Sequence, residues 1–213
     1  MPRSRYILIA RVLHWILAIG IIAEIILGLY GDNMPYGAGR AAARATTLYT
    51  FHKTFGVVLL AIAIAFTLWM QLGPKRPAPA GQSLERQDWD RALGRLVYWG
   101  LLVAIFAIPI TGPILHSNGP SWGYAPMFRP FGDRVPGVPE SFASNAVVRA
   151  FHVESWWLFA GLAIIPVLLW LRRRHLRRHP ALRPATLTVD ARLVRLAPLG
   201  GVLIWLAVAA LVA

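Results

Sequence analysis

The chain has 213 residues, of which 57% are hydrophobic, and its mean hydropathy is +0.54. A water-soluble domain has too small a core for so much apolar surface, so most of these residues are expected to face lipid. The chain contains no cysteine, which excludes disulfides, thiolate-bound zinc, cysteine-ligated iron–sulfur clusters and covalently attached haem. Any redox centre in this chain must therefore use histidine or methionine.

The net charge of +13 is typical of nucleic-acid binding as much as of membrane proteins, so its distribution decides the interpretation. With a cytoplasmic N-terminus, 16 of the 22 positive residues lie inside: Arg3, Arg5, Arg11, Lys75, Arg76, Arg86, Arg91, Arg95, Arg172, Arg173, Arg174, Arg177, Arg178, Arg183, Arg192 and Arg195. The other six lie outside: Arg40, Arg44, Lys53, Arg129, Arg134 and Arg149. This bias follows the positive-inside rule, so lipid is the expected partner and nucleic acid is not.

The apolar residues form five runs, each of about the 20 residues that a helix needs to cross the hydrocarbon layer. The runs are 6–30, 50–72, 96–115, 151–171 and 196–213. We therefore predict an all-α integral membrane protein: a four-helix transmembrane bundle within residues 1–175, a basic cytoplasmic linker over 176–195, and a fifth, C-terminal transmembrane helix. The first run is longer than the apolar part of a signal peptide, so it is expected to be retained.

Two connections differ in character. The connection 73–94 contains Gly-Pro-Lys-Arg-Pro-Ala-Pro and a charged stretch, which predicts a cytoplasmic loop with no soluble domain. The outer loop 117–150 is the longest connection and is rich in proline and aromatic residues. Such a loop either caps a site or anchors passively at the membrane surface, and both interpretations stay open.

Histidine inside a spanning helix is costly and usually faces the bundle interior. His52 and His152 each stand one or two residues inside the outer end of a predicted helix, and those two helices run in the same direction. The two side chains therefore share a depth and can face each other, which is the arrangement that the iron of a six-coordinate haem requires. Gly56, Ala160 and Gly161 are small residues nearby that can give the ring room.

His14, in the cytoplasmic half of the first helix, is the candidate ligand of a second haem. Its partner is expected 14 residues beyond His152, where the fourth helix returns to nearly the same face, but that position is Pro166. Proline cannot bind iron and tends to kink a helix. We therefore predict one haem, with two as the alternative. His116, His175 and His179 are interpreted as helix-end or basic-edge residues.

Four motifs resemble the bacterial cytochrome b561 family and the wider group of membrane cytochrome b subunits of hydrogenases and formate dehydrogenases. They are Arg11-Val-Leu-His14-Trp15, His52-Lys53-Thr-Phe-Gly56, Pro109-Ile-Thr-Gly112 and Phe151-His152-Val-Glu154, and the resemblance covers roughly residues 5–175.

The resemblance implies that the four core helices bind haem b. It matches His52 and His152 to the ligands of an outer haem, and His14 to one ligand of an inner haem. The implied activity is that of a membrane electron-transfer oxidoreductase that exchanges electrons with quinone or quinol and with a periplasmic or membrane redox partner. Arg149 and Lys53 are candidates to pair with haem propionates, and Glu24 is a candidate to accept a quinol proton or to form a structural hydrogen bond.

Two other functions stay open. A transporter would line a proton or metal path with His14, Glu24 and His152. A membrane anchor of a dehydrogenase complex would use the same helices without binding haem itself. The expected location is the bacterial inner membrane, with the N-terminus cytoplasmic and the C-terminus periplasmic, and a homodimer is left open.

Overall fold

The computed structural model describes residues 3–34, 40–73, 86–116, 146–182 and 187–213. The chain divides into two compact units. The first comprises Met1–Arg76 and Phe106–Val153, and the second comprises Pro77–Ile105 and Glu154–Ala213.

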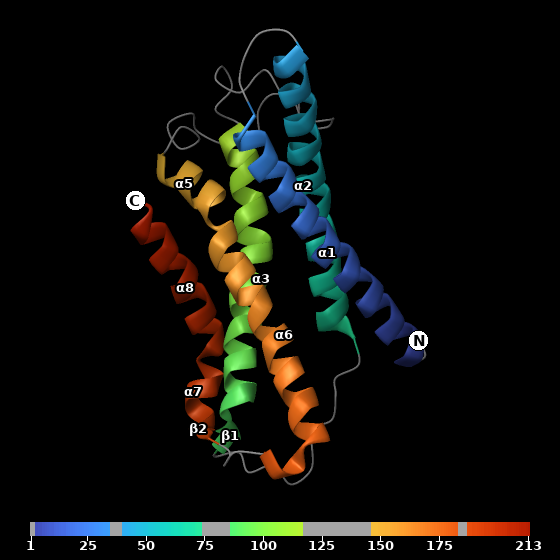
Figure 1. Ribbon diagram of the computed structural model, residues 1–213, viewed down its shortest axis with the longest axis vertical. Helices are drawn as coiled ribbons and strands as arrows, with labels where there is room; N and C mark the ends of the chain where they lie inside the picture. The colour runs from blue at the N-terminus through green and yellow to red at the C-terminus, as the bar shows by residue number, and fades with distance from the viewer. Residues whose placement is uncertain (1–2, 35–39, 74–85, 117–145, 183–186) are drawn as a thin grey trace. The chain divides into compact units, whose positions relative to one another are not determined.

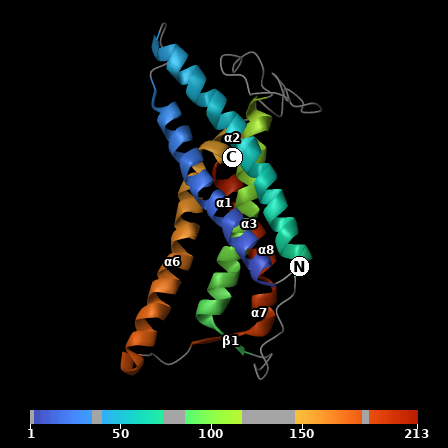
Figure 2. The ribbon, with the colours of Figure 1, turned by 90° about the vertical axis from the view of Figure 1, so that its right-hand side faces the viewer.

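In the first unit, helices α1 (Arg3–Asp32) and α2 (Arg40–Leu72) lie side by side and run in opposite directions (Figures 1 and 2). The end of α1 is closed by Asn33, whose side-chain amide donates to the carbonyl of Leu29 at 2.8 Å. An asparagine at this position satisfies a carbonyl that has no partner within the helix. The chain then turns back into α2.

Small residues and aromatic rings hold α1 and α2 together. A Cβ at Gly20 would lie 2.5 Å from a methyl carbon of Leu59, so the two helices approach closely there. At the other end of the pair, Tyr6 and Trp69 stack with ring centres 5.7 Å apart, and the Trp69 indole N–H donates to the Tyr6 carbonyl at 3.3 Å. Close backbone approach through small residues is the usual way in which membrane helices associate.

Helix α3 (Trp89–His116) contributes to both units and contains Pro109 and Pro113. Helix α5 (Ala146–Glu154) is followed by α6 (Trp156–Arg178), and the helix is interrupted at the buried Ser155. Pro166, where a kink was predicted, lies inside α6, and the helix continues through it. The interruption lies three turns earlier, directly after the turn that carries His152.

The second unit contains short elements besides its helices. Strands β1 (Arg86–Asp88) and β2 (Thr188–Asp190) pair antiparallel, with Arg86 opposite Asp190. The short helix η2 (Pro180–Leu182) follows α6, and Asp190 caps α7 (Ala191–Arg195) by accepting from the Arg192 amide at 2.7 Å. Within this unit, the start of α3 and the end of α6 are joined by an ion pair between Asp90 and Arg172.

Helix α8 (Ala197–Leu211) packs against α3 in the second unit. The buried Trp205 donates its indole N–H to the Gly100 carbonyl at 2.7 Å. A Cβ at Gly201 would lie 2.7 Å from the backbone of Trp99, so glycine is needed for this approach. Gly200 also faces α3, because a Cβ there would lie 2.6 Å from a methyl carbon of Leu96.

Four helices are long and apolar enough to cross a membrane: Ser4–Asp32, Ala43–Leu72, Trp89–Leu115 and Ala146–Arg178. The predicted fifth spanning helix over 196–213 is not supported. Helix α8 has 15 residues, which span about 22 Å against the roughly 30 Å of the hydrocarbon layer. The periplasmic C-terminus was inferred from that fifth crossing and loses its basis.

The predicted helix ends were also wrong in part. Helix α2 begins at Arg40 rather than at residue 50, and α3 begins at Trp89 rather than at residue 96. Hydropathy marks only the lipid-facing part of a helix, whereas alanine and arginine continue it beyond the lipid. Predictions for the outer loop, including Arg129 and Arg134, fall mostly on residues 117–145, outside the described residues.

Candidate functional site

The first unit brings two histidines from different helices together. His52, on α2, and His152, on α5, have ring centres 6.2 Å apart with their planes at 70°. Their predicted positions at helix ends were wrong for His52, which lies 12 residues after the start of α2. The two rings nevertheless lie close to each other, because both histidines keep a similar depth on helices of the same direction.

The His152 imidazole is oriented by α3. Its Nδ1 lies 3.0 Å from the Ile108 carbonyl oxygen and 2.9 Å from the Thr111 hydroxyl oxygen, and that hydroxyl also donates to the Ile108 carbonyl at 2.7 Å. Because a carbonyl only accepts, the contact with Ile108 assigns the proton to Nδ1. The other nitrogen, Nε2, then presents a lone pair.

The His52 imidazole is oriented by α1. Its Nδ1 lies 2.6 Å from a carboxylate oxygen, Oε2, of Glu24. The two side chains are largely buried, with 20% of His52 and 12% of Glu24 exposed. The directions depart from those of a hydrogen bond, so among the described residues Nδ1 of His52 and Oε1 of Glu24 have no hydrogen-bond partner.

A glycine stands against each of the two rings. A Cβ at Gly28 would lie 3.2 Å from Cε1 of His52, and a Cβ at Gly112 would lie 3.2 Å from Cε1 of His152. Any larger residue would push the rings away from their positions. Each half of the site therefore consists of one histidine, the groups on a neighbouring helix that lie beside its Nδ1, and one glycine of that same helix.

This donor set fits a metal ion held between two imidazoles. With metal–nitrogen bonds of about 2 Å on opposite sides of one ion, two imidazole ring centres lie about 6 Å apart. The observed separation is 6.2 Å. Ligating histidines commonly donate the N–H of the other ring nitrogen to a carboxylate or a carbonyl, and these are the two partners found at His52 and His152.

The remaining predicted residues lie elsewhere or make other contacts. His14 is exposed on α1, and its ring centre lies 6.4 Å from that of Phe66. Lys53 is half-buried beside His52 on α2, and Arg149 is exposed on α5. A Cβ at Gly56 would be in ordinary contact with Glu24, at 3.6 Å, whereas Gly161 is exposed with open space around it. Neither glycine stands against a histidine ring.

The roles of Gly28, Ile108, Thr111 and Gly112 were not predicted from the sequence. Two of them, Thr111 and Gly112, belong to the Pro-Ile-Thr-Gly motif, which was recognised without a function. That motif was therefore the one sequence feature that could have indicated a role for Thr111 and Gly112 in the site. No signal in a single sequence distinguishes Gly28 from other glycines of α1, because the rotation of α1 about its axis decides which residue meets the ring.

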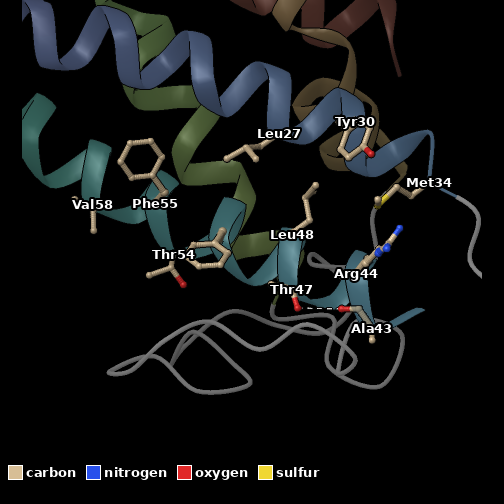
Figure 3. Close-up of a pocket in the computed structure, with 11 residues that line it drawn as sticks. Leu27, Tyr30, Met34, Ala43, Arg44, Thr47, Leu48, Thr54, Phe55 and Val58 are labelled. Atoms are coloured by element: carbon tan, nitrogen blue, oxygen red, sulfur yellow. Dashed lines mark hydrogen bonds between the residues drawn. The ribbon is translucent and has the colours of Figure 1, made fainter. Parts of the chain in front are cut away.

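A groove of about 960 Å³ lies along α1 and α2 in the first unit (Figure 3). Side chains from α1 and α2 line it: Leu27, Tyr30, Met34, Ala43, Arg44, Thr47, Leu48, Phe51, Thr54, Phe55 and Val58. The lining is mainly apolar and aromatic, with Arg44 supplying charged N–H donors. Mainly apolar pockets of this size with a few polar groups are typical of small-molecule sites.

The four long apolar helices make the chain a multi-pass membrane protein. It belongs to the prokaryotic cytochrome b561 family, which matches residues 5–185. The chain is therefore a membrane b-type cytochrome that binds haem b and takes part in electron transfer. No curated protein and no solved structure matches the chain.

Proposed function

We propose that His52 and His152 are the two axial ligands of one haem b, and that this haem exchanges electrons with quinone or quinol and with a periplasmic or membrane redox partner. The observation that carries the proposal is the 6.2 Å separation of the two rings, each with its Nδ1 within 3.0 Å of an oxygen on another helix. Haem b, when bound, takes up and releases one electron at its iron.

The chain's own residues perform three tasks in this proposal. Nδ1 of each histidine keeps its proton by facing an acceptor, so Nε2 is free to bind iron. Gly28 and Gly112 leave the space that the rings need. The surrounding apolar helices exclude water, which lets nearby charges and hydrogen bonds act strongly on the redox potential.

The haem content tests the ligand assignment. Detergent-purified protein is expected to show one b haem per chain in the dithionite-reduced minus oxidised spectrum, with pyridine haemochrome quantification. His52→Ala and His152→Ala are each expected to lose it, whereas His14→Ala is expected to keep it. Two haems per chain, or haem retained in either of the first two variants, would show that the assignment is wrong.

The groove beside His52 supports a quinone site. Phe51, Phe55 and Val58 offer an apolar surface for the quinone ring and tail, and Arg44 offers N–H donors to a quinone carbonyl oxygen. His52 lies on the adjoining face of α2, within about one helix diameter of 10 Å. A quinone in this groove would be close enough to exchange electrons with a haem bound at His52.

Filling the groove tests this location. Val58→Trp is expected to slow the reduction of haem by a short-chain quinol about tenfold or more, with dithionite reduction unchanged. Ile26→Trp is a matched control, because Ile26 is exposed on α1 and does not line the groove. Equal quinol rates in the two variants would place the quinone elsewhere.

The proposed location is the bacterial inner membrane with a cytoplasmic N-terminus. The support is the excess of arginine in the connection after α2 and at the end of α6, which fits the positive-inside rule. Cysteine-labelling of residue 3 and of residue 149 from each side of sealed vesicles tests it. Labelling of Arg149→Cys from the cytoplasmic side would overturn this orientation.

A further inference from the structure

The two histidines of the site have chemically different partners. Nδ1 of His152 faces two neutral groups on α3, the Ile108 carbonyl and the Thr111 hydroxyl. Nδ1 of His52 faces the carboxylate of Glu24 on α1 at 2.6 Å. If the two imidazoles bind one iron, that iron therefore has one ligand beside neutral groups and one ligand beside an acid.

Glu24 lies inside a membrane-spanning helix, where burial of an acidic side chain costs free energy. It lies eight residues before the end of α1, a helix with the length and hydropathy of a membrane span, and only 12% of its side chain is exposed. One of its oxygens, Oε1, is buried without a hydrogen-bond partner among the described residues. Acidic residues inside membrane helices are rare because of this cost, and they usually mark a functional contact.

The carboxylate of Glu24 lies against His52 rather than against lipid. Its Oε2 lies 2.6 Å from Nδ1 of His52, and a Cβ at Gly56, one turn further along α2, would lie 3.6 Å from the same oxygen. The acid therefore fills the space between α1 and the histidine-bearing face of α2. A carboxylate this close to Nδ1 favours the tautomer with the proton on that nitrogen and increases electron density on the ring.

We propose that Glu24 is a positioning residue that sets the redox potential of the haem: it holds His52 in the tautomer that leaves Nε2 for iron, and its charge stabilises the oxidised iron relative to the reduced iron. The inference rests on the proposed ligation by His52 and His152. Hydrogen bonds and charges around a ligand are among the means by which a protein tunes a haem.

The test compares midpoint potentials at one pH in proteins that keep their haem. Glu24→Gln retains an acceptor for the Nδ1 proton and loses the charge. We expect it to favour the reduced state about tenfold or more at a fixed potential, which is a rise of at least about 59 mV for a one-electron couple. Low-spin ferric electron paramagnetic resonance is expected to shift as the imidazole loses its anionic partner.

Asp32→Asn is the matched control. It removes the same charge from the same helix, but Asp32 is exposed at the end of α1, eight residues from Glu24. Its haem is expected to keep the wild-type potential. An equal rise in both variants would mean that only the net charge of the protein matters, and would overturn the role of Glu24.

The remaining outcomes separate this inference from the proposed function. Haem retained in Glu24→Gln with an unchanged potential and spectrum would overturn the role of Glu24 and leave the ligation intact. Haem lost from Glu24→Gln but held by Glu24→Asp would support a positioning carboxylate, whereas haem held by Glu24→Gln at the wild-type potential but lost from Glu24→Asp would show that Glu24 acts in packing only. Wild-type protein without haem would remove the proposed function itself.

Discussion

The glycine beside His152 gives a prediction whose magnitude follows from the structure. In Gly112→Ala, the new Cβ lies 3.2 Å from Cε1, 3.7 Å from Nε2 and 3.9 Å from Nδ1 of the ring. Carbon atoms prefer a separation of about 3.5–4.0 Å, so the ring must retreat by roughly 0.3 Å or more. The ring cannot retreat freely, because Ile108 and Thr111 hold its Nδ1.

Two costs follow from this retreat. Turning the ring away from its rotamer costs about 0.5–1.5 kcal/mol, and lengthening the Nδ1 contacts costs a share of a hydrogen bond worth about 0.5–1.5 kcal/mol. The sum is about 1–3 kcal/mol, and each 1.4 kcal/mol corresponds to a factor of about ten in affinity. We therefore expect haem to bind Gly112→Ala about 5- to 150-fold more weakly.

Whereas haem affinity is expected to fall in Gly112→Ala, the stability of the haem-free protein is expected to rise. Alanine is favoured over glycine within a helix by about 1 kcal/mol. The substitution therefore stabilises the helix while it weakens haem binding. Haem affinity is measured as the rate of haem transfer to excess apomyoglobin, and stability as the thermal midpoint of the haem-free protein. These opposite signs distinguish a site effect from general destabilisation.

Gly161→Ala is the control, because Gly161 is also helical but has open space around it. It is expected to gain helix stability and keep the haem affinity of the wild type. Gly28→Ala is expected to match Gly112→Ala, since its Cβ would lie at 3.2 Å from the His52 ring. Equal haem transfer rates for Gly112→Ala and Gly161→Ala would refute the steric argument.

Three further variants test single contacts. Thr111→Val removes the hydroxyl at 2.9 Å from Nδ1 of His152 but keeps the Ile108 carbonyl. Haem release is expected to accelerate tenfold or less, because one neutral hydrogen bond contributes about 0.5–1.5 kcal/mol. A complete loss of haem would contradict this expectation. Trp205→Phe leaves the buried Gly100 carbonyl without its donor and is expected to destabilise the packing of α8 by about 1–3 kcal/mol, measured by thermal unfolding in detergent, with haem content unchanged. Asp90→Asn breaks a partly exposed ion pair with Arg172 and is expected to cost less than about 1 kcal/mol, a cost that high salt should remove; a larger, salt-independent loss of thermal stability would show that the pair is shielded from solvent.

Hydropathy predicted the four spanning helices because an uninterrupted apolar run has one stable form in lipid, in which the backbone satisfies its own hydrogen bonds. It did not predict where those helices end outside the lipid, as at Arg40 and Trp89, since polar helix formers continue them there. The break at Ser155 had no proline or glycine to mark it. Helix α6 continues through Pro166 although proline has no backbone N–H to donate.

The sequence predicted which two histidines of the site lie together, but not the residues that surround their rings. Parallel directions of two helices and similar depth were enough to pair His52 with His152. The acid at His52, the carbonyl at His152 and the two glycines depend on how each helix is rotated about its axis. A rotation of one residue, about 100°, would exchange the neighbours of both rings, and a single sequence does not fix it.

Because the two halves of the site lie in different parts of the sequence, one half is synthesised before the other. Glu24, Gly28 and His52 belong to the first two helices, which leave the ribosome first, whereas His152 follows His52 by 100 residues. At about 5–20 residues per second, this gap corresponds to roughly 5–20 s of synthesis. Under the proposed ligation, the first helical hairpin enters the membrane with an imidazole already oriented but with no second ligand, so haem capture must wait until the later helices insert.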